Sequence, residues 1–398
     1  VTKLVGARRA EWPAADYVGG NPPFLGGWRM PQSFGEGYTL ALHQSYTHIP
    51  EKADYVMYWW DRAATLARQG SVKAFGFITT NSITHVFQRK VIEHHTSAVP
   101  AIELIFAIPD HPWVDDATAA AVRIAMTVAV VRGETACGAV LGFVDESATL
   151  TDGAPHVQFN RVDVLHSDLR AGANLPSAVP IRSNADLCCP GMQLFGAGFL
   201  VDTVTEAKIN EGVAADLARS IVRPFVNGRD LMGKPRQLFA IDFHGLSSAQ
   251  ALAAHPNAFQ RVLDVVKPER DANKVAYLRD RWWLFGRERQ ALRRALKSLR
   301  RYIVTPETSS HRVFQFLDAL MLPDNMVTAV AIDDAWFLGV LSSRVHVTWA
   351  LAAGGRLGVG NDPRYNKTRC FDPFPFPDAP PDQAARIREL AESLDAHR

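Results

Sequence analysis

Four consecutive residues near the start of the sequence, Asn21-Pro22-Pro23-Phe24, combine groups that could hold an aromatic amine. The Asn21 side-chain carbonyl and the Pro22 main-chain carbonyl are hydrogen-bond acceptors, and the Phe24 ring offers a flat face for stacking. Two acceptors and a ring match the exocyclic amino group of a nucleobase. Because the lone pair of such a nitrogen is conjugated, the main task is to align it with an electrophile. The tetrapeptide therefore predicts a site that orients a base amine for reaction.

The same residues have a plainer interpretation as a turn, because Asn and Pro are both common in turns. A base within a duplex could reach the loop only after flipping out of the stack, at a cost of a few kcal/mol. The position of the tetrapeptide favours the functional interpretation. It follows a predicted short strand, Asp16–Gly20, which the two prolines cannot continue. Ligands of open α/β sheets bind at such carboxyl ends of strands.

The elements that must position this loop follow it in a regular order. Apolar residues at helical spacing predict helices over Asp54–Gln69 and Phe87–His94, and apolar runs predict strands over Lys73–Thr80, Ala101–Ile108 and Val122–Val131. This order indicates an α/β fold, the second half of a doubly wound sheet. The regular alternation ends near residues 151–161. Beyond it we expect a helical stretch over Asn273–Tyr302, strands over Met326–Ile332 and Ala335–Leu341, and a closing helix over Asp382–Asp395.

The tetrapeptide, together with the strand before it and the elements after it, resembles the catalytic loop of the amino-group DNA methyltransferases. The second half resembles the target-recognition region of fused type II restriction–modification (type IIG-like) methyltransferases, over Arg223–Leu231, Arg281–Gly286, Arg300–Arg312, Leu338–Ala350 and Arg364–Pro377. The resemblance implies that Asn21 and Pro22 hold the target amine and that Phe24 stacks on the flipped base. Asn rather than Ser at position 21 favours adenine-N6 over cytosine-N4 transfer by analogy.

The resemblance also implies a fold and a domain plan. The expected fold is the second half of a Rossmann-like methyltransferase sheet followed by an α+β target-recognition domain. We expect a partial catalytic domain over residues 1–155, a DNA target-recognition domain over 156–380 and a C-terminal helix over 381–398. The alternative is a non-catalytic DNA-recognition module that needs a partner or an upstream cofactor half.

The cofactor implied by the family is S-adenosylmethionine, which is held by a Gly-rich turn after a strand and an acidic residue on the next strand. Only 20 residues precede Asn21, and none of them forms that turn. Gly196-Ala197-Gly198 and Gly358-Val359-Gly360 lack the required flanking residues and are expected to be ordinary turns. We therefore expect the cofactor-binding half, and any fused nuclease, upstream of Val1, and weak cofactor binding and poor methylation by this chain alone. The cofactor-binding residues remain unassigned.

Basic residues in the second half predict contact with double-stranded DNA. Arg289, Arg293, Lys297 and Arg300 are spaced by three and four residues, so on a helix they would share one face that could follow a phosphate backbone. A solvated surface helix is the plainer alternative. Candidates for contacts within the recognition region are Arg344, Arg364, Lys367 and Arg369, with His346 more typical of a structural histidine.

Composition limits the remaining classes. The chain has 398 residues, 47% of them hydrophobic and 21% charged, which is typical of a folded protein of two domains and excludes a disordered chain. Lys and Arg number 43 and Asp and Glu 41, so net charge alone names no partner. The longest apolar run, Ile124–Val131, is too short to span a membrane. The cysteines form no C-x-x-C pair, so we expect no disulfide scaffold, no metal site and a cytoplasmic location.

Overall fold

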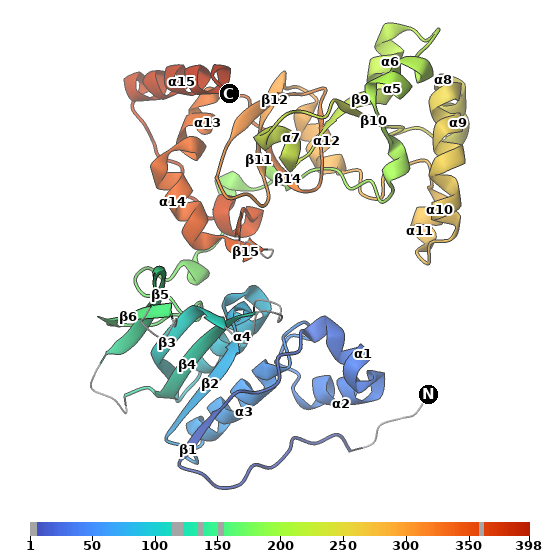
Figure 1. Ribbon diagram of the computed structural model, residues 1–398. Coiled ribbons are helices and arrows are strands. Elements are labelled where there is room, and N and C mark those ends of the chain that lie inside the picture. Colours follow the sequence, from blue (N-terminus) through green and yellow to red (C-terminus); the bar gives the residue numbers. More distant parts are fainter. Residues whose placement is uncertain (1–5, 114–121, 134–137, 150–154, 358–361) are drawn as a thin grey trace. The chain divides into compact units, whose positions relative to one another are not determined.

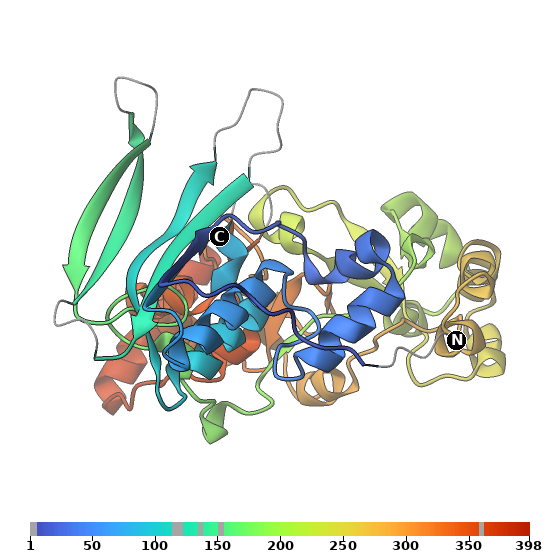
Figure 2. The ribbon, with the colours of Figure 1, turned by 90° about the horizontal axis from the view of Figure 1, so that it is seen from below.

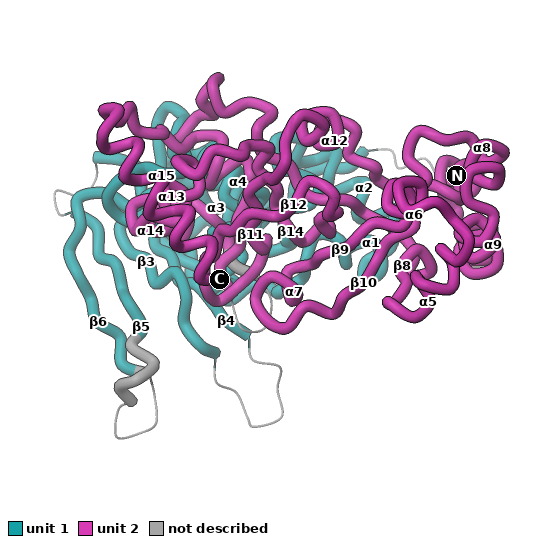
Figure 3. The backbone as a smooth tube through the Cα atoms, turned by 90° about the horizontal axis from the view of Figure 1, so that it is seen from above, with its two compact units in different colours: residues 1–177 teal, residues 178–398 magenta. Residues whose placement is uncertain are grey.

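The computed structural model describes residues 6–113, 122–133, 138–149, 155–357 and 362–398. The chain forms two compact units, residues 1–177 and residues 178–398 (Figure 3). The first unit extends beyond the boundary near residue 155 that the sequence predicted. Leu165 and Leu169 are buried in its core, and the Ser167 hydroxyl donates to Glu93 Oε1 at 3.1 Å. The segment after residue 162 therefore belongs to the first unit.

A six-stranded mixed sheet forms the centre of the first unit, in the order β1-β2-β4-β3-β5-β6 (Figure 1). β1 runs parallel to β2, β4 runs antiparallel to both β2 and β3, and β3 runs parallel to β5. β6 pairs antiparallel with β5 as a two-stranded ribbon (Figure 2). The strands are β1 Tyr17–Gly20, β2 Ala74–Thr80, β3 Ile102–Trp113, β4 Val122–Val131, β5 Ala139–Thr149 and β6 Pro155–Val162. The predicted α/β class is confirmed.

The helices of the first unit are α1 Met30–Phe34, α2 Glu36–Ser45, α3 Val56–Arg68 and α4 Val86–Thr96. α3 and α4 pack against each other and against the central strands. In β2, side chains alternate between buried and half-buried, and Phe75 lies edge-on to Trp60 of α3 with ring centroids 5.1 Å apart. This burial of aromatic surface is the main reason that α3 lies on the sheet. The sequence predicted α3, α4 and β1–β4 but missed α1, α2, β5 and β6.

The second unit contains two four-stranded sheets, ordered β13-β9-β10-β8 and β12-β11-β14-β7, and the β15-β16 pair. Its strands are β7 Cys188–Pro190, β8 Leu200–Val201, β9 Val222–Val226, β10 Leu238–Ile241, β11 Arg301–Pro306, β12 Gln315–Asp318, β13 Leu322–Pro323, β14 Val327–Val330, β15 Gly355–Leu357 and β16 Asp362–Arg364. Its helices are α5 Thr203–Ile209, α6 Ala215–Ile221, α7 Gly228–Met232, α8 Ser248–Ala254, α9 Pro256–Val265, α10 Lys267–Asp271, α11 Ala276–Asp280, α12 Gln290–Leu296, α13 Ala335–Ser342, α14 Arg344–Ala353 and α15 Pro381–Ala396.

Two sequence-based predictions in the second unit are wrong. The stretch 273–302 is not one helix: it contains only the short helices α11 and α12, and β11 begins at Arg301. Residues 335–341 form helix α13 rather than a strand. Its first turn is capped by Asp334, whose side chain accepts from the Trp336 N–H at 2.8 Å. Since a short apolar run fits a buried helix as well as a strand, the cap decides between them. The predicted strand around β14 and the closing helix α15 are confirmed.

The C-terminal helix α15 is an integral part of the second unit. It packs against α13 at Gly339, where a Cβ would lie 2.5 Å from Ile387 Cγ2, so only glycine fits this crossing. Arg388 forms an ion pair with Asp334, with Nε 2.8 Å from Oδ1, and the Asp395 carboxylate accepts from the Phe316 N–H at 2.8 Å. Among the described residues, none of the helices is both long and apolar enough to cross a membrane.

Candidate functional site

The Asn21–Phe24 loop leaves the sheet at the carboxyl end of β1. Gly20 is the last residue of that strand and lies beside Phe77 of the parallel strand β2, which continues to Thr80, so the loop leaves β1 on the side toward which both strands run. Pro22 is buried, whereas Asn21 and Pro23 are exposed and Phe24 is 37% exposed. The buried proline anchors the loop, while the amide of Asn21 and the ring of Phe24 remain accessible to a ligand. The geometry is therefore compatible with the predicted amine-holding role.

Asp54 connects the segment after this loop to the turn after β2. One carboxylate oxygen, Oδ1, accepts from the Gly27 N–H at 3.3 Å, and the other, Oδ2, accepts from the Ser82 hydroxyl at 2.6 Å. The Tyr55 N–H adds a bond of 2.8 Å to the carbonyl of Leu25. These bonds hold the chain on the far side of the tetrapeptide close to the start of α3. Sequence reasoning missed this connection, for which an Asp before an apolar helix was the available signal.

Gly27 is also required sterically. A Cβ at this position would lie 2.6 Å from the carbonyl oxygen of Ala53 and 2.8 Å from that of Lys52. Both are main-chain atoms, which cannot rotate away as a flexible side chain could. The close approach of the two backbones thus depends on glycine.

An aromatic cavity of about 420 Å³ lies in the same unit between the N-terminal segment, α2 and α3. Its lining includes Trp12, Tyr38, Tyr46, Tyr55 and Trp59. Burial, together with the hydrogen bond between the Tyr55 and Tyr38 hydroxyls, raises the pKa of Tyr55 to about 12, so its hydroxyl is neutral at physiological pH. None of the residues 21–24 lines this cavity.

The two Gly-x-Gly stretches do not provide a cradle for S-adenosylmethionine in the part of the chain that is described. At Gly198 a Cβ would lie 2.7 Å from Val265 Cγ1, so the glycine serves the close packing of this segment on α9. The stretch Gly358–Gly360 lies outside the described residues. The described stretch, Gly196–Gly198, therefore serves packing and does not form the Gly-rich turn of an S-adenosylmethionine site.

Arg289 and Arg293 are engaged within the protein. Arg289 precedes α12 with a φ of 52°, and its Nε donates to the Gly191 carbonyl at 2.9 Å. Arg293 donates two bonds, at 2.6 and 3.0 Å, to the buried carboxylate of Asp242. The prediction that four cations share one helix face is wrong, because α12 ends at Leu296 and Arg300 lies beyond it.

The other basic candidates lie in two places of the second unit. Lys297 and Arg300 are exposed just after α12, and Arg344 is exposed at the first position of α14. Arg364 ends β16 and donates from Nε to Glu307 Oε1 at 2.6 Å. Lys367 and Arg369 follow in the π-helical turn Lys367–Phe371, with Lys367 Nζ 3.6 Å from Asp372 Oδ2. This turn contacts α14, so the structure brings these residues into one region.

His346 belongs to the core rather than to a surface site. It is fully buried, and its Nε2 lies 3.0 Å from the hydroxyl of Tyr365. Burial lowers the pKa of His346 to about 3, with the positive charge of Arg312 as a second cause. The ring is therefore neutral in the folded protein and has a packing role.

Comparison with known proteins matches each unit to a domain model of the MmeI type. The MmeI DNA-methyltransferase domain matches residues 3–139, and the MmeI target recognition domain matches residues 185–378. DNA methyltransferase A of Bacillus subtilis (strain 168) is 24% identical over 413 residues, which cover 99% of this chain and 44% of that protein. The solved structure of the type IIL restriction–modification enzyme MmeI in complex with DNA has the same fold. It gives a TM-score of 0.73 at 19% identity, over 95% of this chain and 49% of that one.

The chain thus spans about half the length of the relatives that it matches. The tetrapeptide and β1–β4 lie within the first family match, and both four-stranded sheets of the second unit lie within the second. The fold expected from the sequence is confirmed. This chain carries a DNA-methyltransferase domain and a target recognition domain of the MmeI type.

Proposed function

We propose that this chain forms the catalytic and recognition parts of a site-specific DNA adenine-N6 methyltransferase that uses S-adenosylmethionine as methyl donor. The observation that supports this most is the Asn21–Phe24 loop: it lies at the carboxyl end of a parallel strand within the methyltransferase domain, with Asn21 exposed and Phe24 partly exposed. The two domain matches support DNA as the substrate, and the tetrapeptide supports a base amine as the acceptor.

In this proposal the target adenine flips out of the duplex and stacks on Phe24, which offsets part of the cost of unpairing. The Asn21 side-chain oxygen and the Pro22 carbonyl oxygen accept hydrogen bonds from the two N–H groups of the adenine amine. Holding both N–H groups turns the nitrogen lone pair toward the methyl donor. No strong base is required, since the gain comes from proximity and orientation. S-adenosylmethionine supplies an electrophilic methyl group when it is bound.

DNA contact in this proposal falls to the second unit. The exposed cations Lys297, Arg300 and Arg344 are suited to phosphate contacts, which supply affinity and salt dependence. Arg364, Lys367 and Arg369 lie together on β16 and the following turn, a region suited to closer contact with the duplex. The bonds of Arg289 and Arg293 within the protein favour a structural role for these two residues.

The experiment supplies the chain with an upstream cofactor-binding half and analyses the DNA product by mass spectrometry. We expect N6-methyladenine from the parent protein and about a 100-fold lower rate for Asn21→Ala, the size of effect seen when one positioned polar group is removed. Asn174→Ala, an exposed asparagine of the same unit, is the matched control and should keep the parent rate.

Two results would contradict the proposal in different ways. N4-methylcytosine as the product would overturn the adenine assignment and leave the amino-group chemistry standing. Tight DNA binding without any methyl transfer, although the cofactor half is present, would favour the alternative of a non-catalytic recognition module.

A further inference from the structure

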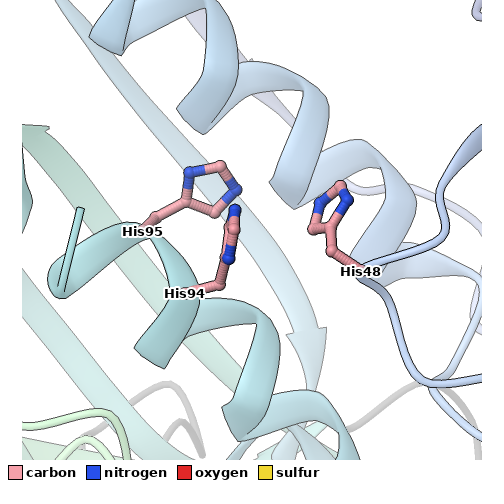
Figure 4. A group of neighbouring side chains, drawn as sticks. All are labelled: His48, His94 and His95. Atoms are coloured by element: carbon pink, nitrogen blue, oxygen red, sulfur yellow. The ribbon is translucent and has the colours of Figure 1, made fainter. Parts of the chain in front are cut away.

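Three histidines of the first unit gather around one small space. His48 lies in the loop between α2 and α3, while His94 and His95 lie in the last turn of α4, and their side chains face one another (Figure 4). One ring nitrogen from each lies within 4.8 Å of those of the other two. The ring centroids of His48 and His94 are 4.6 Å apart, and those of His94 and His95 are 5.0 Å apart.

A buried carboxylate anchors two of these rings. Asp61 of α3 is completely buried, and its Oδ1 lies 2.5 Å from His48 Nε2 and 2.8 Å from His95 Nε2. Burial alone would raise the pKa of Asp61, but the hydrogen bonds from His48 and His95 outweigh it and lower the pKa to about 2. Asp61 is therefore an anion at any ordinary pH, and the two imidazoles direct N–H groups at it.

Two buried polar atoms of this cluster have no hydrogen-bond partner: Oδ2 of Asp61 and Nδ1 of His95. A buried polar atom without a partner costs about 1–3 kcal/mol of stability, so such atoms usually have a function or a missing ligand. In Figure 4 the ring nitrogen of His95 that faces the other two imidazoles is Nε2, which is bonded to Asp61, while Nδ1 points away from them. Three imidazoles that gather beside a buried carboxylate are an environment that a metal ion could occupy.

We propose that His48, His94 and His95 bind one divalent transition-metal ion, with Zn²⁺ as the best fit, and that Asp61 orients two of the three rings. Neutral imidazole is a common ligand of zinc, and the Asp61 carboxylate supplies a negative charge beside the rings of His48 and His95. The cluster is graded in exposure, from buried His95 through half-buried His48 to exposed His94. The exposed side, at His94, gives the ion a path in.

The geometry requires only a small adjustment. With Zn–N bonds of about 2.05 Å in a tetrahedron, ligand nitrogens lie roughly 3.4 Å apart. The present spacing of up to 4.8 Å must therefore close by somewhat more than an ångström. Because His94 is exposed, rotation of its side chain can supply most of this movement.

Such an ion would have a structural role. It would join the end of α4 to the loop before α3, the same loop that ends at Asp54 and so reaches the segment behind the base-binding tetrapeptide. The proposal is independent of the methyltransferase assignment, because it concerns metal affinity and stability of the first unit.

The test uses the full chain after dialysis against a chelator, titrated with Zn²⁺ in a calorimeter. We expect one ion per chain, and affinity at least about tenfold weaker for His94→Ala and for His48→Ala. His94→Ala is the informative variant, because this exposed side chain can be removed without opening the core. His311→Ala, an exposed histidine of the other unit, is the matched control and should bind zinc like the parent. Co²⁺ in place of zinc should give the visible absorption of a tetrahedral site, and His94→Ala should lose it.

Failure to bind zinc stoichiometrically would overturn the proposal, as would equal affinity in the parent and both cluster variants. In either case the three rings would be a stacked and hydrogen-bonded part of the core. Circular dichroism of each variant separates loss of the site from loss of the fold.

Discussion

Replacing Gly27 by alanine should displace the chain that follows the base-binding loop. The new Cβ would lie 2.6 Å from the Ala53 carbonyl oxygen and 2.8 Å from that of Lys52, so the backbone must move. Overpacking of this kind costs about 1–3 kcal/mol. Loss of the Gly27–Asp54 hydrogen bond adds about 1 kcal/mol. Alanine also lowers the conformational entropy of the unfolded chain, which restores about 0.4–1 kcal/mol of stability. We therefore expect a net loss of about 1–4 kcal/mol in the free energy of unfolding.

Urea unfolding of the full chain, followed by near-ultraviolet circular dichroism, measures this loss. With a slope of about 2 kcal/mol per molar urea, the midpoint of the first unit should fall by about 0.5–2 M. Gly20→Ala is the matched control, because a Cβ there meets nothing within 4 Å, and it should change the midpoint little. Equal midpoints for the two variants would refute the steric account of Gly27 and, with it, the argument that this contact fixes the loop.

Three further outcomes follow from the second unit. Arg293→Ala should cost about 1–3 kcal/mol, because it removes two charge-assisted hydrogen bonds from the buried Asp242 carboxylate while Arg223 remains 3.5 Å from it. Lys297→Ala at an exposed position should stay within about 0.5 kcal/mol by urea unfolding. Lys297→Ala should also reduce the slope of log K against log salt for DNA binding by about 0.9, and an unchanged slope would exclude this phosphate contact. The folded pKa of His346 is about 3, against 6.5 for an ordinary histidine, so the unfolded chain binds the additional proton. Stability should therefore fall as the pH drops from about 6.5 toward 3, by at most about 1.4 kcal/mol per pH unit, and His346→Gln should flatten this dependence in acid titrations.

The elements of the first unit that the sequence predicted are those whose local pattern reflects burial. β2 alternates because one face of it meets α3, and α3 shows a wide apolar stripe for the same reason. The missed elements lack such a pattern. α2 carries little contrast between its faces, and β5 and β6 form a ribbon in which Phe143 and Phe159 are about half exposed. In the second unit, short helices interrupted by loops left no period long enough to recognise.

In the candidate site, too, features formed by adjacent residues could be predicted, whereas contacts between residues far apart in the sequence could not. The tetrapeptide could be found because all its chemistry lies in four adjacent residues. The bond between Asp54 and Ser82 joins positions 28 apart, and those from Asp61 to His48 and His95 span 13 and 34 positions, so only the folded chain brings them together. For the same reason, the spacing of Arg293 predicted an exposed helix face, while its actual partner, Asp242, lies 51 positions away.

The way α15 closes the second unit matters for exchanging recognition parts between enzymes of this type. The target recognition match ends at residue 378, before α15 begins at Pro381. A recognition domain transferred only up to that residue would lack α15, so the apolar helix α13 would be exposed to solvent. The ion pair of Asp334 with Arg388 and the hydrogen bond of Phe316 to Asp395 would also be lost. Chimeric enzymes that carry the graft through Ala396 should therefore keep the donor's fold, whereas grafts that stop at residue 378 should be prone to precipitation.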